Sequence, residues 1–347
     1  MKTTLHYSLL SILALLAACV DSSTRSSTSD TASASRQTPV VTSVRVNQGT
    51  YGMTARLRWV ISPDSSAVIA VVDPAGVENE AVPNAFFYGS ERRNFQTRMD
   101  SVWDVAPSPD WGTIAFSRAY VLNAGGEDSI TATMWQELSR RTRIDTTTLR
   151  TGSFPSSAMT VARGVAQPGV IQIPADTRAV GAADASAARM YPVALGWNVR
   201  WTPDGATIAL GNSPAKGYDD EQSVSWAALD PKTGAFHGTL PASSQLVVPR
   251  WTNGPVLDIA TPVDMQGAPT IHIKSGSRQL SIESLRGVIT AHEVGTGSDS
   301  TARIFTIGSG KALAATKGGR YIIALAPRSR IVANEIPVEA VVYVVGW

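Results

Sequence analysis

The sequence predicts an all-β protein built from repeated small sheets, and three observations support this. The first is a turn that recurs at residues 62–64, 108–110 and 202–204, each time with an apolar run beginning five residues after its proline. The second is a strand followed by a glycine turn, at residues 226–234 and again at 304–310. The third is the spacing of these elements, which implies a repeat of about 40–50 residues.

The clearest copy of the turn shows why it reverses the chain. Pro203 fixes φ at the first corner and holds the preceding residue extended, while Asp204 and Gly205 supply a polar corner and one that tolerates positive φ. A strand therefore enters through Trp201 and another leaves through residues 208–210. The outgoing run is apolar on both faces, which predicts a strand packed between two sheets.

Two further copies lack the proline, at residues 251–254 and 317–319. The five anchors then fall at 63, 109, 203, 253 and 317, and the long interval between the second and third predicts a degraded copy near residue 156. A repeat of this length containing several short strands is typical of a propeller blade. We therefore predict a β-propeller of six blades, with five or seven as the alternatives.

The pattern W-x-S/T-P-D-G-x-x-I-A resembles the TolB-like, WD-type β-propeller repeat of periplasmic TolB and of prolyl-oligopeptidase-type peptidases. The resemblance covers roughly residues 40–347. It implies the fold but no single function, because such blades serve as binding platforms and as enzyme lids. Unlike TolB, this chain shows no α/β domain before the propeller and begins with a lipid-attachment signal, which argues against a direct TolB role.

A propeller ring needs its first and last blades joined. The β-prone run at residues 338–345 and the run at 40–46 are the natural partners. We expect residues 41–47 to supply the outer strand of the blade that begins at Lys317. This pairing removes two exposed sheet edges.

The first residues have the layout of an export signal. Met1 and Lys2 precede an apolar run at 9–16, which is too short for a transmembrane helix, and Leu-Ala-Ala-Cys at 16–19 closely resembles a bacterial lipoprotein cleavage site. The resemblance implies that the thiol of Cys19 carries a lipid, and the alternative is an ordinary signal peptide in which Cys19 is incidental. Cys19 is the chain's single cysteine, so no intramolecular disulfide can form.

The domain organisation follows from this signal. Residues 1–18 form the signal peptide, residues 19–39 the lipidated cysteine with a disordered Ser/Thr-rich tether, and residues 40–347 the propeller. Val20 follows the cysteine, and by the sorting habit of lipoproteins this favours the outer membrane facing the periplasm. Asp21 keeps the inner membrane as the alternative.

The search for chemistry finds no catalytic set. The chain has no Gly-x-Ser-x-Gly elbow, and residues 308–311 are too short for a phosphate loop. His237, His272 and His292 are not spaced as metal ligands, and Glu293 should point to the opposite face of a strand from His292. We therefore predict no catalytic, cofactor-binding or metal-binding residue.

Charge argues against a nucleic-acid partner, since the precursor carries a net charge of only +2. The clusters at residues 91–93 and 140–143 are expected to be solvated faces. Arg140, Arg141 and Arg143 lie in the long interval before the third proline turn, as part of a helical insertion or a decorated outer strand, and are candidate partner contacts.

Tryptophans provide another candidate contact. Those at 59, 103, 197, 201 and 251 occupy repeat positions, which predicts packing between blades. Trp111 instead stands at a turn position where glycine is expected, and is a candidate anchor for a partner or a glycan.

These observations favour a monomeric, lipid-anchored protein of the cell envelope that binds another envelope protein as a scaffold. The alternative is a hydrolase, or a carbohydrate-active or ligand-binding propeller, with its site in the central funnel. A ligand sensor is the third hypothesis, which the sequence does not separate from the first.

Overall fold

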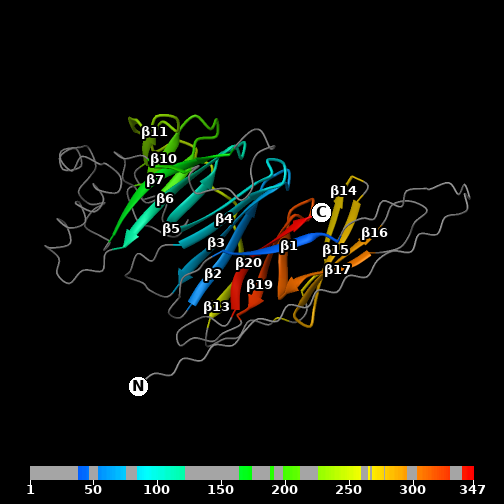
Figure 1. The fold of residues 1–347 in the computed structure, drawn as a ribbon. Coiled ribbons are helices and arrows are strands. Elements are labelled where there is room, and N and C mark those ends of the chain that lie inside the picture. Colours follow the sequence, from blue (N-terminus) through cyan, green and yellow to red (C-terminus); the bar gives the residue numbers. More distant parts are fainter. Residues whose placement is uncertain are drawn as a thin grey trace, which may run out of the picture. The chain divides into compact units, whose positions relative to one another are not determined.

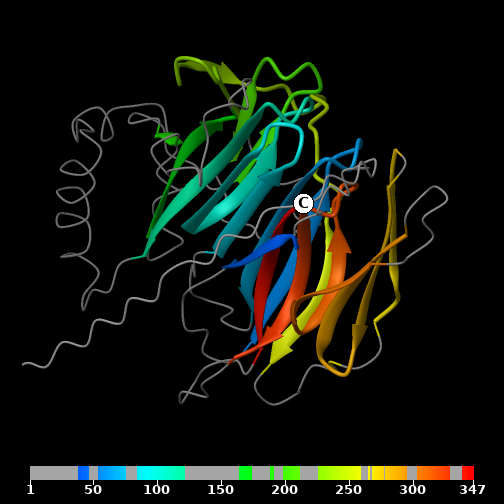
Figure 2. The same cartoon turned by 45° about the vertical axis from the view of Figure 1, so that its right-hand side comes forward.

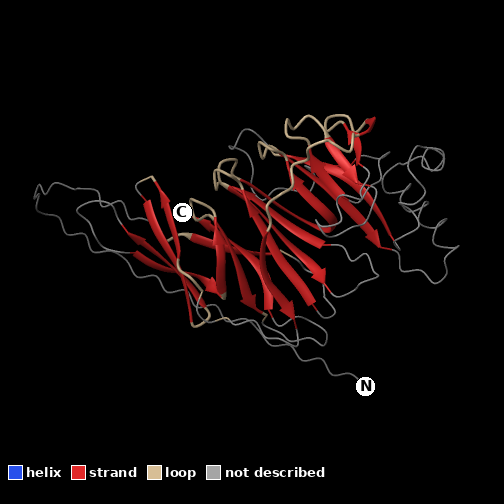
Figure 3. Ribbon diagram, turned by 180° about the vertical axis from the view of Figure 1, so that it is seen from behind, coloured by secondary structure: helices blue, strands red, loops and turns tan. Residues whose placement is uncertain are grey.

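The structure, a computed structural model, describes residues 38–46, 54–75, 84–121, 164–173, 188–190, 198–211, 226–258, 265, 268–276, 278–294, 303–328 and 338–347. Within these ranges the chain is all-β, with every strand pair antiparallel and no helix (Figure 3). The all-β fold class predicted from the recurrent turns is confirmed.

The largest sheet has eight strands in the order β13-β2-β3-β4-β5-β6-β7-β8 (Figure 1). Its strands are β2 (Thr54–Ile61), β3 (Ala67–Ala75), β4 (Asn84–Ser90), β5 (Phe95–Pro107), β6 (Thr113–Val121), β7 (Gly164–Gln172), β8 (Ala188–Met190) and β13 (Thr252–Asp258).

The long strand β5 makes this sheet two four-stranded units rather than one. Up to Val102 its residues pair with β4, and from Val102 onward they pair with β6, with a register shift at each of these pairings. The strand is therefore the last of the unit β2-β3-β4-β5 and the first of the unit β5-β6-β7-β8.

Two further sheets repeat the four-stranded plan, in the orders β12-β11-β10-β9 and β14-β15-β16-β17 (Figure 2). Their strands are β9 (Asn198–Trp201), β10 (Ile208–Gly211), β11 (Trp226–Leu229), β12 (Phe236–Thr239), β14 (Ile271–Ser275), β15 (Arg278–Leu285), β16 (Val288–Val294) and β17 (Arg303–Ser309).

The last sheet contains both the first and the last strand of the described chain. It runs β1-β20-β19-β18, from β1 (Val40–Arg45), β20 (Val338–Gly346), β19 (Tyr321–Pro327) and β18 (Lys311–Ala315), and β1 lies beside β20 in Figure 1. Val41 pairs with Val345 and Val44 with Val342. The prediction that the first strand completes the last sheet is confirmed.

The described residues form five such four-stranded units, which is the strand plan of propeller blades. They do not fix the number of blades. The copy at residues 251–254 gives β13, which pairs along β2 instead of starting its own unit, and the copy expected near residue 156 lies outside the described residues. The six-blade count and the closed ring remain predictions.

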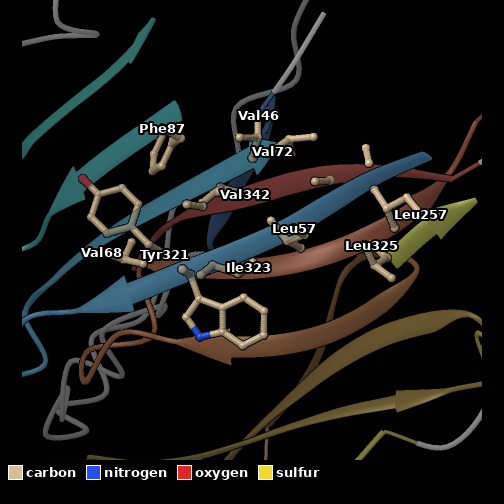
Figure 4. Packing of buried hydrophobic residues seen from close by; sticks show 14 of the residues in the cluster. Val46, Leu57, Val68, Val72, Phe87, Leu257, Tyr321, Ile323, Leu325 and Val342 are labelled. Carbon is tan, nitrogen blue, oxygen red and sulfur yellow. The ribbon is translucent and has the colours of Figure 1, made fainter. Parts of the chain in front are cut away.

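The core lies between strands that are buried on both faces. Along β19, Tyr321, Ile323 and Leu325 enter one apolar cluster with residues of β2, β3 and β20 (Figure 4), while the alternate Ile322 and Ala324 enter a second cluster with the sheet β14–β17. The expectation that apolar runs after each turn are packed between two sheets is met here.

Tryptophans at repeat positions pack in this core. Trp59, Trp103 and Trp201 have exposed fractions of 8%, 5% and 2%, and the Trp201 Nε1–H donates to the Ala106 carbonyl on β5 at 3.0 Å. The predicted packing between units is confirmed for Trp59 and Trp201, whereas for Trp103 burial alone is shown. Trp251 is only half-buried, and Trp197 lies outside the described residues.

Candidate functional site

The recurrent turn is held by a hydroxyl and a carboxylate two residues apart. In each proline copy the hydroxyl donates to the carboxylate and accepts the backbone N–H of the residue five positions later. The donations run from Ser62 to Asp64 at 2.7 Å, Ser108 to Asp110 at 2.6 Å and Thr202 to Asp204 at 2.5 Å. The accepted N–H groups are those of Ala67, Thr113 and Thr207, at 2.9, 2.9 and 3.1 Å.

Each aspartate also accepts a backbone N–H within its own turn. The donors are Ser66 at 3.1 Å, Gly112 at 3.0 Å and Ala206 at 3.0 Å. One carboxylate thus fixes both corners of the reversal, in the manner of an Asx turn. This explains why the motif needs a hydroxyl residue and an aspartate at this spacing.

These bonds hold the three carboxyl groups ionised. The Ser62 hydroxyl, followed by the Ser66 groups and nearby Lys317, lowers the pKa of Asp64 to about 2. Hydrogen bonds from Ser108 and Thr202 likewise lower the pKa of Asp110 and of Asp204. A general acid needs a pKa near the working pH, so these aspartates are framework groups rather than proton donors.

The residue after each aspartate adopts positive φ. The angles are 57° at Ser65, 58° at Trp111 and 68° at Gly205, and Gly319, which follows Gly318 in the fourth copy, has 72°. The prediction that Trp111 occupies a glycine position is confirmed, and this conformation costs a residue with a side chain about 1–2 kcal/mol. The ring offsets part of this cost, since it is half-buried with its centroid 6.5 Å from that of Tyr88.

The turn between β18 and β19 lacks a carboxylate of its own, because Gly318 stands where the other copies have aspartate. Glu91, from the turn between β4 and β5, takes its place. Its carboxylate accepts the Thr316 hydroxyl, the Arg320 N–H at 3.0 Å and the Gly318 N–H at 2.9 Å. A Cβ at Gly318 would lie 2.6 Å from Glu91 Oε2, so the glycine makes room for the incoming carboxylate.

This contact joins the last sheet to the unit β2–β5. The Lys317 N–H donates to the Ser65 carbonyl at 2.8 Å, and Lys317 Nζ lies 3.9 Å from Asp64 Oδ2. At the same junction Gly89 leaves space for the Tyr321 ring, which a Cβ would approach to 2.8 Å. Two neighbouring turns are therefore fixed to each other.

A buried ion pair makes a comparable junction between β5 and β9. Asp104 Oδ2 accepts from Arg200 Nη1 at 2.5 Å and from the Val199 N–H at 3.0 Å, while its Oδ1 accepts from the Val105 N–H at 2.9 Å. Both charged side chains are more than nine-tenths buried. Removing either partner would leave a buried charge without compensation.

The histidines of the sheet β14–β17 have neighbours on their own face. His292 Nε2 lies 3.5 Å from Glu283 Oε2, whereas Glu293 meets Arg278 at 3.0 Å. The predicted opposite orientation of His292 and Glu293 is confirmed. His272 Nδ1 lies 3.1 Å from Ser281 Oγ.

The predicted site residues are placed only in part. Trp111 is described and lies in the turn at residues 108–113, whereas Cys19, Arg140, Arg141 and Arg143 lie outside the described residues. In the part of the chain that is described, no three His, Cys, Asp or Glu side chains gather as possible metal ligands. The same part contains no apolar helix of membrane-spanning length.

Glu91 is the framework residue that sequence reasoning missed. The expectation that residues 91–93 form a solvated face is wrong for Glu91, because its carboxylate is used by the 316–320 turn. The missing aspartate at position 318 could have signalled that an acceptor comes from elsewhere. Nothing in the sequence identified Glu91 as that acceptor.

Comparison with known proteins adds little to this picture. No protein-family model and no curated protein matches the chain. Among solved structures, it is similar to the β-propeller domain of the trilobed protease from Pyrococcus furiosus, at 10% identity and a TM-score of 0.27, over 81% of this chain and 66% of that one.

Two further similar structures have different activities. An acylaminoacyl peptidase from Pyrococcus horikoshii matches at 11% identity and a TM-score of 0.28, over 80% of this chain and 36% of the peptidase. A family 117 glycoside hydrolase from Zobellia galactanivorans matches at 9% identity and 0.24, over 89% and 90%. The chain thus spans about a third of the peptidase's length, and at these TM-scores the strand pairing alone defines the fold.

The borrowed carboxylate predicts a compensating pair of substitutions. Glu91→Ala should lower the free energy of unfolding by about 2 kcal/mol, because it removes a charged acceptor from three donors. Gly318→Asp alone should also destabilise the protein, since the introduced carboxylate and that of Glu91 would then compete for the donors of the 316–320 turn. The double variant should lose at least about 1 kcal/mol less free energy of unfolding than the two single losses added together.

Urea unfolding of the four proteins measures this coupling. Arg92→Ala, which changes the exposed neighbour of Glu91, serves as the control and should change stability by less than about 0.5 kcal/mol. Strictly additive losses in the double variant would contradict the exchange of carboxylates.

The lowered pKa of Asp64 predicts an acid-dependent loss of stability. The folded pKa of about 2 lies below the unfolded value near 4, so the contribution is complete above pH 5 and is lost as the pH falls toward 2. Because Asp64 is half-exposed, we expect its share to be only about 1 kcal/mol.

Asp64→Asn tests this share. The variant should be less stable than the wild type at pH 7, and the difference should shrink steadily between pH 5 and pH 2 in urea titrations. An unchanged difference across this range would show that the ionisation of Asp64 is not linked to folding.

Proposed function

We propose that this chain is a lipid-anchored binding protein of a bacterial cell envelope, which holds a protein partner on its propeller-type sheets. The anchor rests on the export-signal layout of residues 1–19, with the Leu-Ala-Ala-Cys motif placing Cys19 at the cleavage site. The Ser/Thr-rich run that follows would act as a tether. We further propose the outer membrane, facing the periplasm, as its location and a monomer as its state.

The structural use of five of the described carboxylates is the observation that supports the binding role. Asp64, Asp110 and Asp204 each brace a turn, Glu91 braces a fourth, and Asp104 accepts three bonds at a junction between sheets. Groups committed in this way give rigidity rather than proton transfer. Turns held rigidly at the ends of strands are suited to presenting side chains to a partner.

The turn at residues 108–113 supplies the first candidate contact. Trp111 combines a partly exposed ring with a fixed backbone, as expected for an aromatic anchor. We include Arg140, Arg141 and Arg143 as further contacts on the strength of the sequence alone. A partner with an acidic patch would suit the three arginines.

In-cell crosslinking with a tagged protein tests the proposal. The wild type should incorporate a fatty-acid label and capture a defined envelope protein, and Cys19→Ala should lose both the label and most of the capture. Trp111→Ala, or joint substitution of the three arginines by alanine, should reduce capture of the same protein at least about fivefold.

Two controls separate binding from folding. Ile304→Ala changes a side chain that is 63% exposed on another sheet, and Arg92→Ala changes an exposed arginine in the turn between β4 and β5. Both should leave capture unchanged. The proposal would be contradicted if capture of every envelope protein were the same in the wild type, in Trp111→Ala and in the arginine variant. Turnover of a peptide or glycan by the soluble domain would then favour the hydrolase alternative.

A further inference from the structure

An aromatic ring that is partly accessible to solvent lies directly after β20. Trp347, at the end marked C in Figure 1, is 41% exposed. The guanidinium carbon of Arg278 lies 3.7 Å from the centroid of its ring, which is a cation–π distance, and the Phe305 ring meets it edge-on with centroids 4.9 Å apart. Residues of β15 and β17 thus hold the Trp347 ring while part of it stays in water.

The turn between β18 and β19 supports the same ring. Gly319 adopts a φ of 72°, and a Cβ there would lie 3.4 Å from Cζ2 of Trp347 and 3.0 Å from Cδ1 of Leu280. The Val345 N–H donates to the Arg320 carbonyl at 2.8 Å, which fixes the last residues of β20 to this turn. The ring therefore has a position that is set by two sheets.

The first described strand begins beside this ring. Val40, the first residue of β1, pairs with Gly346, and its side chain is 71% exposed. By the alternation of a strand, the side chains of Val40 and Trp347 leave opposite faces of the sheet at the same end. A flat surface laid across the strand ends can therefore touch both.

The charges around this end do not oppose a lipid surface. Arg278 pairs with Glu293 at 3.0 Å, and Lys317 Nζ lies 3.9 Å from Asp64. The described charges in the turns at 62–66, 90–94, 108–113 and 316–320, and at the neighbouring ends of β14–β17, are the basic Arg92, Arg93, Lys274, Arg278, Arg303, Lys317 and Arg320 and the acidic Asp64, Glu91, Asp110 and Glu293. The excess is basic, so neither neutral nor anionic headgroups are repelled.

The proposed anchor brings a membrane to this end of the sheet. Residues 20–37 separate Cys19 from Thr38, the first described residue, and a polar chain of about 20 residues has a mean reach on the order of 25 Å. A lipid on Cys19 would keep Val40 near the bilayer at a high effective concentration, so that even a weak contact is populated. Tryptophan is enriched at membrane interfaces, because its ring is apolar while its N–H is polar.

We propose that the strand end carrying Val40 and Trp347 rests on the lipid surface, with the Trp347 ring at the level of the headgroups. The contact rests on the proposed anchor at Cys19 and deepens it, because it gives the anchored protein an orientation. Leu285, at the other end of β15 from Arg278, then lies about 20 Å farther from the bilayer.

Quenching by brominated lipids tests the contact in the full, anchored chain. The protein is floated with phosphatidylcholine vesicles whose acyl chains are brominated near the headgroups, and its fluorescence is compared with that in unbrominated vesicles. The Trp347 signal is the difference between the wild type and Trp347→Phe, and we expect it to be quenched at least about twofold. The signal of Trp226, half-buried on β11 and obtained in the same way from Trp226→Phe, should change by less than about a tenth.

Two exposed apolar residues provide a matched pair of variants. Val40 and Leu285 are 71% and 68% exposed. Val40→Asp should reduce the quenching at least about twofold, because a carboxylate at the interface loses hydration, whereas Leu285→Asp should leave it unchanged. Total tryptophan quenching shows this difference even if Trp347→Phe does not fold.

The outcomes separate the contact from the anchor. Absence of the chain from the floated vesicles would overturn the anchor and the contact together. A floated chain whose Trp347 signal is unquenched, or in which Val40→Asp and Leu285→Asp behave alike, would overturn the contact alone and leave the anchor standing.

Discussion

One carboxylate, accepting a hydroxyl and a backbone N–H inside a six-residue reversal, is the interaction on which the strand arrangement depends. It closes the turns between β2 and β3, between β5 and β6, and between β9 and β10 with the same bonds. Because a hairpin's turn fixes the register of its two strands, it also fixes which residues face each side. The strands leaving these turns are apolar on both faces, which suits burial between two sheets.

The fourth turn shows that the geometry matters more than the residue that supplies it. Position 318 holds glycine, and Glu91 from another unit provides the carboxylate to the same set of donors. The consequence is that a local turn becomes a tie between the last sheet and the unit β2–β5. Together with the pairing of β1 and β20 and the buried Asp104–Arg200 pair, it links units far apart in sequence.

Local chemistry explains which features were predictable from sequence. The Pro-Asp spacing predicted the turns, the continuous apolar runs predicted strands buried on both sides, and the β-prone runs at 40–46 and 338–345 predicted the β1–β20 pair. Long-range contacts carry no such local signal. Glu91, the Asp104–Arg200 pair and the Arg278–Trp347 stack each join residues whose types fit many environments, so only the folded arrangement identifies them.

Hydrogen exchange tests the role of the carboxylate most directly, because it reports on the individual N–H groups that it accepts. The Arg320 amide depends on Glu91, whereas the Ala206 amide depends on Asp204 in its own turn. In Glu91→Gln we expect protection of Arg320 to fall at least about tenfold while that of Ala206 is unchanged. Equal protection of Arg320 in the variant and the wild type would contradict the account, because the turn would then hold without its carboxylate.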